Sequence, residues 1–399
     1  MFPSFYELIN YLLGIELPVF KIVKTFGFIM ASAFLVGAIV IIKEFKRLKN
    51  DGYLQPIKET FRKGFPADWG EYIGNGIFGF LIGYKLSLFI LNFNDFFWRD
   101  PELYLFSADG YPLGGLIGAA IFIFWIYRKR KKEELPQPIV EQRNVWPHER
   151  VWDIITLAAF SGILGAKLFT WFEDWDGFMS DPLGHLVSLQ GLTFYGGLIC
   201  ATAVLLTFAY FKKINLLRLM DVGGMAVMLS YGVGRLGCHF SGDGDWGDPN
   251  PHTLPDWLSW LPDWLWAFDY PGNVAKVGVR IPDCMGEYCF VLPNPVYPTP
   301  VWEFMMAVII FGVLWSLRKR LVIYPGLLFA VYLVFNGIER FTIEMIRVNA
   351  DYELFGMAFS QAQIIAMCLI GTGLILGTIL YTYFKKNPIK PVFSASDVP

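Results

Sequence analysis

The sequence predicts an all-α, polytopic membrane protein with about nine transmembrane helices. Hydrophobic residues make up 55% of the 399 residues and aromatic residues 18%, whereas charged residues make up 17%, below the roughly one quarter usual in soluble domains. A soluble core could not bury that much apolar surface. The formal net charge of -2 offers no basic stripe, so we expect the lipid bilayer as a partner and no nucleic acid.

Nine apolar runs are candidates for spanning helices, because a helix needs ~20 residues to cross ~30 Å of hydrocarbon. The clearest are Ile22 to Ile42, Met305 to Leu317 with its flanks, and Ile364 to Tyr383. Weaker runs, interrupted by glycine or a single charge, lie near 70–92, 112–127, 151–172, 194–211, 217–234 and 325–346. The first run is longer than a signal-peptide core and lacks a small-residue cleavage site, so we expect it to be retained.

The distribution of lysine and arginine predicts the orientation, because short cytoplasmic loops are enriched in them. Basic clusters follow every second run, at 43–49, 128–132, 212–213, 318–320 and 385–386. The intervening loops are acidic, and the segment 238–297 is rich in Asp, Trp and Pro. Their acidic residues are Asp95, Asp100, Glu102, Glu173, Asp174, Asp176 and Asp181. The N-terminus is therefore predicted outside and the C-terminus inside.

Two short motifs recur with one spacing. Gly-Tyr-Lys-Leu at 83–86 recurs as Gly-Ala-Lys-Leu at 165–168, and Gly-Gly-Leu-Ile at 114–117 recurs at 196–199, each 82 residues later. A shared offset predicts a duplicated two-helix unit. We expect four parts: an N-terminal segment with the first transmembrane helix (1–68), an additional two-helix unit (69–150), a membrane core (151–385, with the second copy at 151–213) and a cytoplasmic tail (386–399).

Ionisable residues inside the predicted spans are expensive unless they face protein or water, so they are candidate functional residues. At 1.5 Å per residue, Arg235, Arg340 and Lys167 lie ~22 to ~26 Å beyond the cytoplasmic ends of their helices. Tyr195 and Glu303 open helices that start at the same level. The sequence therefore predicts one polar layer near the outer face.

Arg340, Glu344 and Arg347 are spaced i, i+4 and i+7, which places them on one helical face. Such a face can be an ion-paired interior surface of a bundle, and Arg347 near the water boundary can be a snorkelling side chain. Two arginines that face one site would instead suit a phosphate, which accepts bidentate hydrogen bonds from guanidinium groups. Both interpretations stay open.

The most specific stretch is Gly-Val-Gly-Arg-Leu-Gly-Cys-His-Phe-Ser-Gly-Asp-Gly-Asp-Trp-Gly at 232–247. Its glycines let the backbone turn and approach a ligand closely. The stretch resembles the hallmark of the prolipoprotein diacylglyceryl transferase family, Gly-Arg-x-Gly-Asn-Phe-x-Asn-Gly-Glu-x-x-Gly. Asp243 stands where the family has Glu, one extra residue precedes Trp246-Gly247, and Cys238 and Ser241 replace the two Asn. The outright matches are Gly234, Arg235, Gly237 and Gly242.

Other segments extend the resemblance over roughly residues 20–385. Residues 193–199 resemble the family's Ser-Phe-His-Gly-Gly-Leu, with Tyr195 in place of the functional His and with Gly196 and Gly197 retained. Residues 165–168 resemble Gly-Ala-Arg-Leu with Lys167 for Arg, and residues 297–303 resemble His-Pro-x-Gln-Leu-Tyr-Glu. Residues 340–347 match Arg-x-x-x-Glu-x-x-Arg, and Phe26-Gly27 stands where the family has Tyr-Gly.

The resemblance implies transfer of the diacylglyceryl group of phosphatidylglycerol to the lipobox cysteine in the signal peptide of a prolipoprotein. Glycerol phosphate is released, and this is the first step of lipoprotein maturation. The expected location is the bacterial cytoplasmic (inner) membrane, multi-pass, with the active site toward the outer face. No cofactor is implied, and no His/Cys cluster has metal spacing.

The resemblance also implies residue roles. Arg235, Arg340 and Lys167 are expected to bind the lipid phosphate with Gly234, Gly237 and Gly242, and Glu303, Arg347, Gly196, Gly197 and Phe26 to support the site. The incoming thiol needs a proton acceptor. Candidates are Asp243, Glu344 and His239; we favour Asp243, although it could merely cap its turn. Tyr195, a poor base at neutral pH, is expected to orient substrate.

Three further points stay open. Cys284 and Cys289 share the outward segment and could form a disulfide, whereas Cys200 and Cys368 are expected to be packing residues. Loss of the His and of both Asn would also fit a lipid-binding homologue without catalysis. A small-solute transporter is a less favoured alternative, because its binding residues would be expected near the midplane.

Overall fold

The predicted apolar runs are all helical in the computed structural model, which describes residues 1–98, 107, 109–180, 182, 193–284, 286–347, 351–354 and 357–391. The helices are α2 (Thr25–Asn50), α3 (Trp69–Leu91), α6 (Pro112–Glu133), α7 (Val151–Glu173), α10 (Phe194–Phe211), α11 (Leu216–Ser241), α12 (Thr299–Leu317), α13 (Leu327–Glu344) and α14 (Gln361–Lys386). Asp100, Glu102 and Asp181, and the end of the predicted tail from 392, lie outside the described residues.

Six helices of the described chain are long and apolar enough to cross a membrane: α2, α3, α7 with the preceding turn η2 (Pro147–Arg150), α11, α12 and α14. Most of α10 is a shorter apolar helix. The chain is therefore a polytopic helical membrane protein, and the count of nine spans stays a prediction. Helix α13 carries three charged residues, Glu339, Arg340 and Glu344, in its last two turns.

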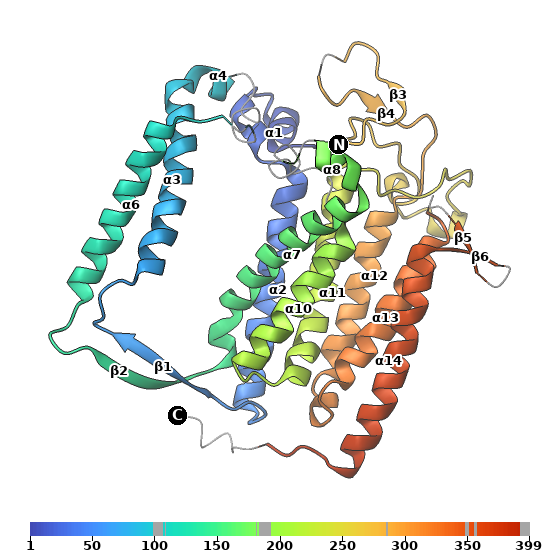
Figure 1. Cartoon of the computed structure of the whole chain (residues 1–399). Helices are drawn as coiled ribbons and strands as arrows, with labels where there is room; N and C mark the ends of the chain where they lie inside the picture. The colour runs from blue at the N-terminus through green and yellow to red at the C-terminus, as the bar shows by residue number, and fades with distance from the viewer. Residues whose placement is uncertain are drawn as a thin grey trace.

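Helix α11 lies at the centre of the main bundle, where it packs against α2, α12 and α13, while α14 packs on the outside of α13 (Figure 1). The core between these helices is apolar and includes the buried side chains of Phe45, Met225, Met228 and Leu314. Gly232 faces Ala307 of α12 so closely that a side chain there would clash. Close backbone approach through small residues is the usual means of helix association in membranes.

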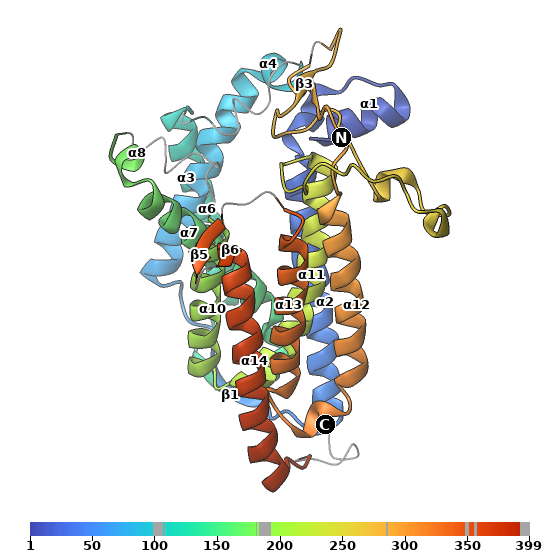
Figure 2. The ribbon, with the colours of Figure 1, turned by 90° about the vertical axis from the view of Figure 1, so that its right-hand side faces the viewer.

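The two ends of the bundle differ in character. The C-terminal ends of α2, α6, α10, α12 and α14, which carry the basic clusters, all lie at the lower end in Figure 1. The upper end holds α1 (Phe5–Leu13), α4 (Phe93–Trp98), α8 (Trp175–Ser180) and the long segment between α11 and α12 (Figures 1 and 2). That segment contains the strands β3 (Val279–Arg280) and β4 (Phe290–Val291), and the turn that joins them is closed by a Cys284–Cys289 disulfide.

Two helical hairpins, α3–α6 and α7–α10, and the strands before them recur with the 82-residue offset seen in the sequence. Strand β1 (Ile57–Lys63) precedes α3, and β2 (Ile139–Val145) precedes α7. The starts of β1 and β2, of α3 and α7, of α4 and α8, and of α6 and α10 are each 82 residues apart. The two strands pair antiparallel, with Thr60 opposite Gln142, which are equivalent positions. Such a pair is related by a local two-fold axis, so the strands join the two hairpins symmetrically.

Equivalent glycines make equivalent contacts inside the two hairpins. A side chain at Gly83 would meet the carbonyl oxygen of Gly114, and one at Gly165 would meet that of Gly196. The tail of the chain adds a short β5 (Asp351–Leu354) and β6 (Met357–Ser360) hairpin before α14. The α3–α6 hairpin stands beside the bundle (Figure 1), with apolar side chains such as Ile77, Leu81 and Ile121 exposed.

The common basic end leads to a topology prediction. Single cysteines at Lys131 and Lys385, placed in a variant with Cys200 and Cys368 replaced by alanine, should react with an impermeant thiol reagent from the same side of the membrane. A cysteine at Asp263, in the segment between α11 and α12, should react from the other side. The expectation rests on the positive-inside distribution. Labelling of positions 131 and 385 from opposite sides would contradict it.

Candidate functional site

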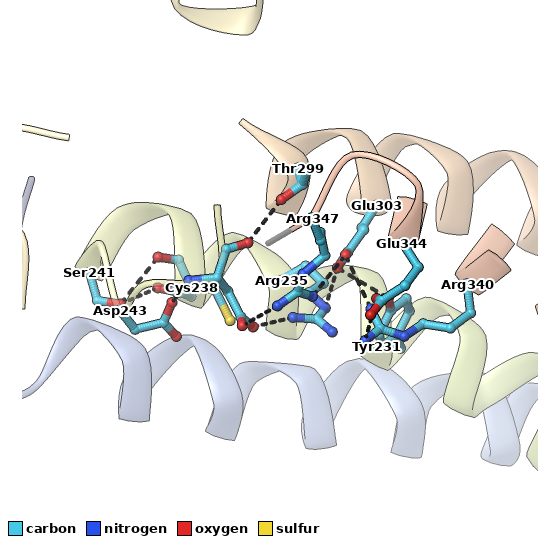
Figure 3. Close-up of polar contacts among 12 residues, drawn as sticks. Tyr231, Arg235, Cys238, Ser241, Asp243, Thr299, Glu303, Arg340, Glu344 and Arg347 are labelled. Carbon is cyan, nitrogen blue, oxygen red and sulfur yellow. Dashed lines mark hydrogen bonds and ion pairs between the residues drawn. The ribbon is translucent and has the colours of Figure 1, made fainter. Parts of the chain in front are cut away.

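A fully buried carboxylate, Glu303, holds three arginines together near the upper end of the bundle (Figure 3). Glu303 lies in the first turns of α12 and pairs with Arg235 of α11, with Arg340 of α13 at 3.7 Å and with Arg347 at 3.5 Å. The hydroxyl of Tyr231 donates to Glu303 Oε2 at 3.1 Å. A lone buried carboxylate would be very unfavourable, so these partners are required for Glu303 to stay ionised.

A second carboxylate, Asp245, links two of the same arginines. Arg347 Nη2 donates to Asp245 Oδ1 at 2.6 Å, and Arg235 Nη1 pairs with Oδ2. The backbone carbonyl of Asp245 accepts from Thr299 Oγ1 at 2.9 Å, which ties the loop after α11 to the start of α12. The Arg235 guanidinium also lies over the Tyr231 ring at 5.1 Å. We call Arg235, Asp245, Glu303, Arg340, Glu344 and Arg347 the arginine cluster.

Arg340 occupies the far side of the cluster. Its Nη2 pairs with Glu344 Oε2 at 3.1 Å, as the i, i+4 spacing predicts, and Ser360 Oγ donates to Glu344 Oε1 at 2.8 Å. Ser360 is also the N-cap of α14, so the pair is fixed by two helices. Within the described chain, Arg340 Nη1 is buried and makes no hydrogen bond. It lies 3.7 Å from Glu303 Oε1, which is an ion-pair distance but not a hydrogen bond.

The snorkelling interpretation of Arg347 is wrong. Its side chain is 11% exposed and turns inward to Asp245 and Glu303. The charge-assisted hydrogen bond to Asp245 and the ion pair with Glu303 stabilise the guanidinium group more than contact with water at the membrane surface would. Arg347 is thus an inner member of the arginine cluster together with Arg235.

The turn after α11 separates two aspartates with different environments. Gly242 (φ 65°) ends the helix in the left-handed conformation and Gly244 (φ 104°) continues the turn. The side chain of Asp243 is exposed at the surface, but desolvation within the turn, and then the neighbouring charge of Asp245, raise its pKa. Burial acts in the same direction on Asp245, but Arg235 and Arg347 outweigh it and lower its pKa. Asp243 is thus a stronger base than an ordinary aspartate, whereas Asp245 stays ionised.

The buried thiol of Cys238 lies beside these aspartates, and its Sγ and the carboxylate oxygens of Asp243 and Asp245 are within 4.8 Å of one another. A thiolate and two carboxylates are suitable zinc ligands. However, Asp245 already pairs with two guanidinium groups, which would compete with a cation. We therefore assign Asp245 to the arginine cluster and not to a metal site.

His239 lies in a different, aromatic environment. Its Nδ1 lies 3.1 Å from the Tyr270 hydroxyl, and its ring is near those of Trp264 and Phe268 at 6.0 and 5.6 Å. The side chain is buried in this aromatic group. These contacts favour a role in anchoring the segment between α11 and α12 over a role as proton acceptor.

The remaining predicted residues lie on four helices, α2, α7, α10 and α11. Phe26 of α2 packs against Gly237 of α11, where a side chain would be tight, and Gly234 faces Met30 of α2. Gly196 and Gly197 fit against α7, where Lys167 is buried. Tyr195 lies in the first turn of α10. Lys167 and Tyr195 thus come from the α7–α10 hairpin and are not among the arginine cluster.

Sequence reasoning missed three members or neighbours of the site: Asp245, Tyr231 and Glu339. The Tyr231 hydroxyl lies 3.3 Å from Glu339 Oε1, so a second buried carboxylate adjoins Glu303. Tyr231 is one helical turn before Arg235, and Glu339 directly precedes Arg340. The helical spacing could have revealed Tyr231. Asp245 could have been found by asking which carboxylates balance three arginines.

Comparison with known proteins identifies similar sequences. The model of the prolipoprotein diacylglyceryl transferase family matches residues 102–379. Proteins named phosphatidylglycerol–prolipoprotein diacylglyceryl transferase are similar to the chain. That of Streptococcus uberis is 26% identical over 236 residues, which cover 58% of this chain and 80% of the relative. Those of Dehalococcoides mccartyi (26% over 259 residues; 64% and 82%) and Paraburkholderia phymatum (26% over 284 residues; 68% and 89%) are similarly related.

The geometry predicts that Glu303→Gln destabilises the protein strongly. Removing this charge leaves Arg235, Arg340 and Arg347 without their shared counterion, which typically costs about 3 kcal/mol or more for buried pairs. Glu287→Gln is the control, because Glu287 makes a surface pair with Lys276 at 3.0 Å and should matter by less than about 1 kcal/mol. Thermal unfolding of the purified protein in detergent measures both. Equal midpoints for the two variants would refute the role of Glu303.

Proposed function

The chain belongs to the prolipoprotein diacylglyceryl transferase family, and we propose how its residues carry out the reaction of that family. The chain transfers the diacylglyceryl group of phosphatidylglycerol to a prolipoprotein, the first step of lipoprotein maturation. The acceptor atom is the lipobox cysteine sulfur. The observation that carries the residue assignment is the arginine cluster, which collects three guanidinium groups at one end of a membrane bundle.

The reaction requires anion stabilisation and a proton acceptor. The thiol sulfur forms a bond to the glycerol carbon of the diacylglyceryl group, and the bond from that carbon to the phosphate oxygen breaks. Glycerol phosphate leaves with the electron pair, and the thiol proton passes to a base. Charge therefore grows on the departing phosphate, where positioned guanidinium groups are most effective.

Arg340 and Arg235 are the proposed phosphate ligands. Their side chains are 22% and 16% exposed, so both can be reached from outside the bundle. Among the described contacts, Nη1 of Arg340 faces Glu303 Oε1 at 3.7 Å without a hydrogen bond. Glu303, Asp245 and Glu344 hold the guanidinium groups in position before the lipid arrives, which reduces the reorganisation needed in the reaction. Arg347 supports them through the same carboxylates.

Asp243 is the proposed proton acceptor. Its raised pKa makes it a better base than an ordinary aspartate, and it lies in the turn after α11, eight residues beyond Arg235. Glu344 is less suitable because Arg340 and Ser360 already engage its two oxygens. Tyr195 and Lys167, from the α7–α10 hairpin, are proposed to orient the substrates.

The active site is proposed to face the outside of the cytoplasmic membrane. The Cys284–Cys289 disulfide supports this side, because disulfides persist in oxidising compartments. The basic ends of α2, α12 and α14 at the opposite end support a cytoplasmic location for that end. The cysteine of a secreted precursor would then meet the arginine cluster after translocation.

One alternative has specific support. Tyr195, Cys238 and Ser241 replace residues that are functional in the family pattern, and a lipid-binding homologue without catalysis would tolerate these changes. Complementation of a bacterial strain depleted of its own transferase separates the two functions. Growth with processed lipoproteins supports catalysis, whereas membrane insertion of the chain without any lipoprotein modification would leave only lipid binding.

The phosphate role predicts that Arg235→Ala and Arg340→Ala each nearly abolish transfer. Loss of one donor to a transition-state anion typically costs on the order of 3 kcal/mol, which is about a hundredfold in rate. Lysine at either position should rescue poorly, because a point charge cannot make the bidentate contact. Transfer from labelled phosphatidylglycerol to a lipobox peptide gives the rates, with Arg280→Ala, in the exposed β3 strand, as the control. Near-normal turnover in either cluster variant would contradict the assignment.

The base assignment predicts a loss of transfer in Asp243→Asn without weaker lipid binding. The amide keeps the size of the side chain but cannot accept a proton at neutral pH. In the wild type, transfer should fall as the pH drops through the raised pKa of Asp243, because protonation removes the base. Asp263→Asn, on the exposed surface, serves as control. If Asp243→Asn is active and His239→Gln is not, the base is His239.

The two hairpins are proposed to have different roles, which predicts that Lys85→Ala stays active and Lys167→Ala does not. Lys85 Nζ donates to the carbonyl oxygens of Ser107 and Asp109 at 2.5 and 3.0 Å, so it fixes its own hairpin loop. Only the second hairpin directly precedes α11 in the sequence. The transfer assay on both variants decides this, and the reverse pattern would show that the copies are assigned backwards.

A further inference from the structure

A charged pocket lies at the end of the bundle opposite the arginine cluster, between the C-terminal ends of α2 and α12. The cavity measures about 580 Å³ and is lined by residues of both helix ends, among them Lys43, Arg47, Arg318 and Lys319. Arg318 is 15 residues beyond Glu303 on α12, which corresponds to ~22 Å along the helix axis. The pocket is therefore separate from the arginine cluster.

The pocket is built around a buried carboxylate. The Glu44 carboxylate accepts hydrogen bonds from Arg47 Nε and Nη2 at 3.0 and 2.5 Å. It also accepts one from Arg318 Nε at 3.1 Å, which joins α2 to α12. Arg318 also lies over the Trp315 ring at 3.5 Å from its centroid. These contacts fix two guanidinium groups in the wall, as Glu303 does at the other end.

The lining carries excess positive charge. Four basic side chains line the cavity, whereas Glu44 and Asp51 are its acidic residues. Glu44 and Asp51 are used by the two arginines. Lys43 and Lys319 are exposed and have no ion pair within the described chain. They are left to neutralise an anion.

A further cation lies behind the wall. Arg218 is buried, donates to the Val322 carbonyl at 2.6 Å, and lies over the Tyr53 ring at 5.2 Å. Tyr53 and Val322 both line the pocket. Within the described chain, Arg218 Nη2 is buried without a hydrogen-bond partner. The unused donor adds to the positive potential of this wall.

We propose that this pocket binds a phosphate group, that of an anionic phospholipid in the leaflet opposite the arginine cluster. Guanidinium and ammonium groups around a cavity at a helix-bundle boundary suit a phosphodiester, and basic pockets between spanning helices recognise anionic headgroups. Trp315 supplies an aromatic surface at the level where such side chains meet headgroups. The bound lipid would link α2 to α12 and stabilise the bundle.

The test uses the purified full-length chain and two double variants. Lys43→Ala with Lys319→Ala removes the two unpaired cations of the pocket. Lys46→Ala with Arg320→Ala removes the same charge from the same helix ends, at exposed residues that do not line the cavity. Neither pair belongs to the proposed catalytic machinery, so both variants should retain transfer activity, which also shows that they fold.

Native mass spectrometry counts retained phosphatidylglycerol, and thermal unfolding is followed with added phosphatidylglycerol, phosphatidylcholine or soluble glycerol phosphate. The pocket variant should retain one phosphatidylglycerol molecule fewer than the wild type and the control. It should also need about tenfold more of that lipid for the same rise in the unfolding midpoint. Stabilisation by glycerol phosphate that depends on Lys43 and Lys319 would identify a soluble phosphate as the ligand. If the pocket and control variants behave alike with every additive, the proposal is wrong.

Discussion

The ionisation of Glu303 inside the bundle is the constraint on which the rest of the site depends. A carboxylate buried at this depth needs cations, and Arg235 of α11, Arg340 of α13 and Arg347 just after α13 satisfy it. The arginines in turn need further carboxylates at their outer sides. Asp245 and Glu344 meet that need, so the loop after α11 and the start of α14 are fixed by the same network. The fold and the proposed phosphate site therefore share one set of ion pairs.

The same network explains how two aspartates in one turn can have different roles. Asp245 contacts the guanidinium groups and is held ionised, whereas the exposed side chain of Asp243 lies near the thiol of Cys238 and the like charge of Asp245. Glycines with left-handed backbone conformations at 242 and 244 allow this separation within a few residues. Asp245, which pairs with the arginines, and Asp243, the proposed proton acceptor, therefore lie close together without both joining the same ion pairs.

Sequence alone predicted the helices well because apolar runs and basic loop ends are strong local signals. It also placed Arg235, Glu303 and Arg340 at one level, since helix rise converts sequence distance into depth. The inward direction of Arg347 and the role of Asp245 could not be read in this way, because they depend on how a loop returns to α12. The antiparallel pairing of β1 with β2, in which equivalent positions face each other, required contacts between distant segments. A periodic pattern does not report such contacts.

In the proposed site, Glu303 and Asp245 hold Arg235 and Arg340 ready for the phosphate of phosphatidylglycerol. The most direct measurement is an experimental structure of the purified protein in nanodiscs that contain phosphatidylglycerol. We predict headgroup density with its phosphate within hydrogen-bond distance of both guanidinium groups, while Glu303 keeps its contacts. A phosphate bound elsewhere, with Arg235 and Arg340 still fully engaged by Glu303, Asp245 and Glu344, would contradict the account.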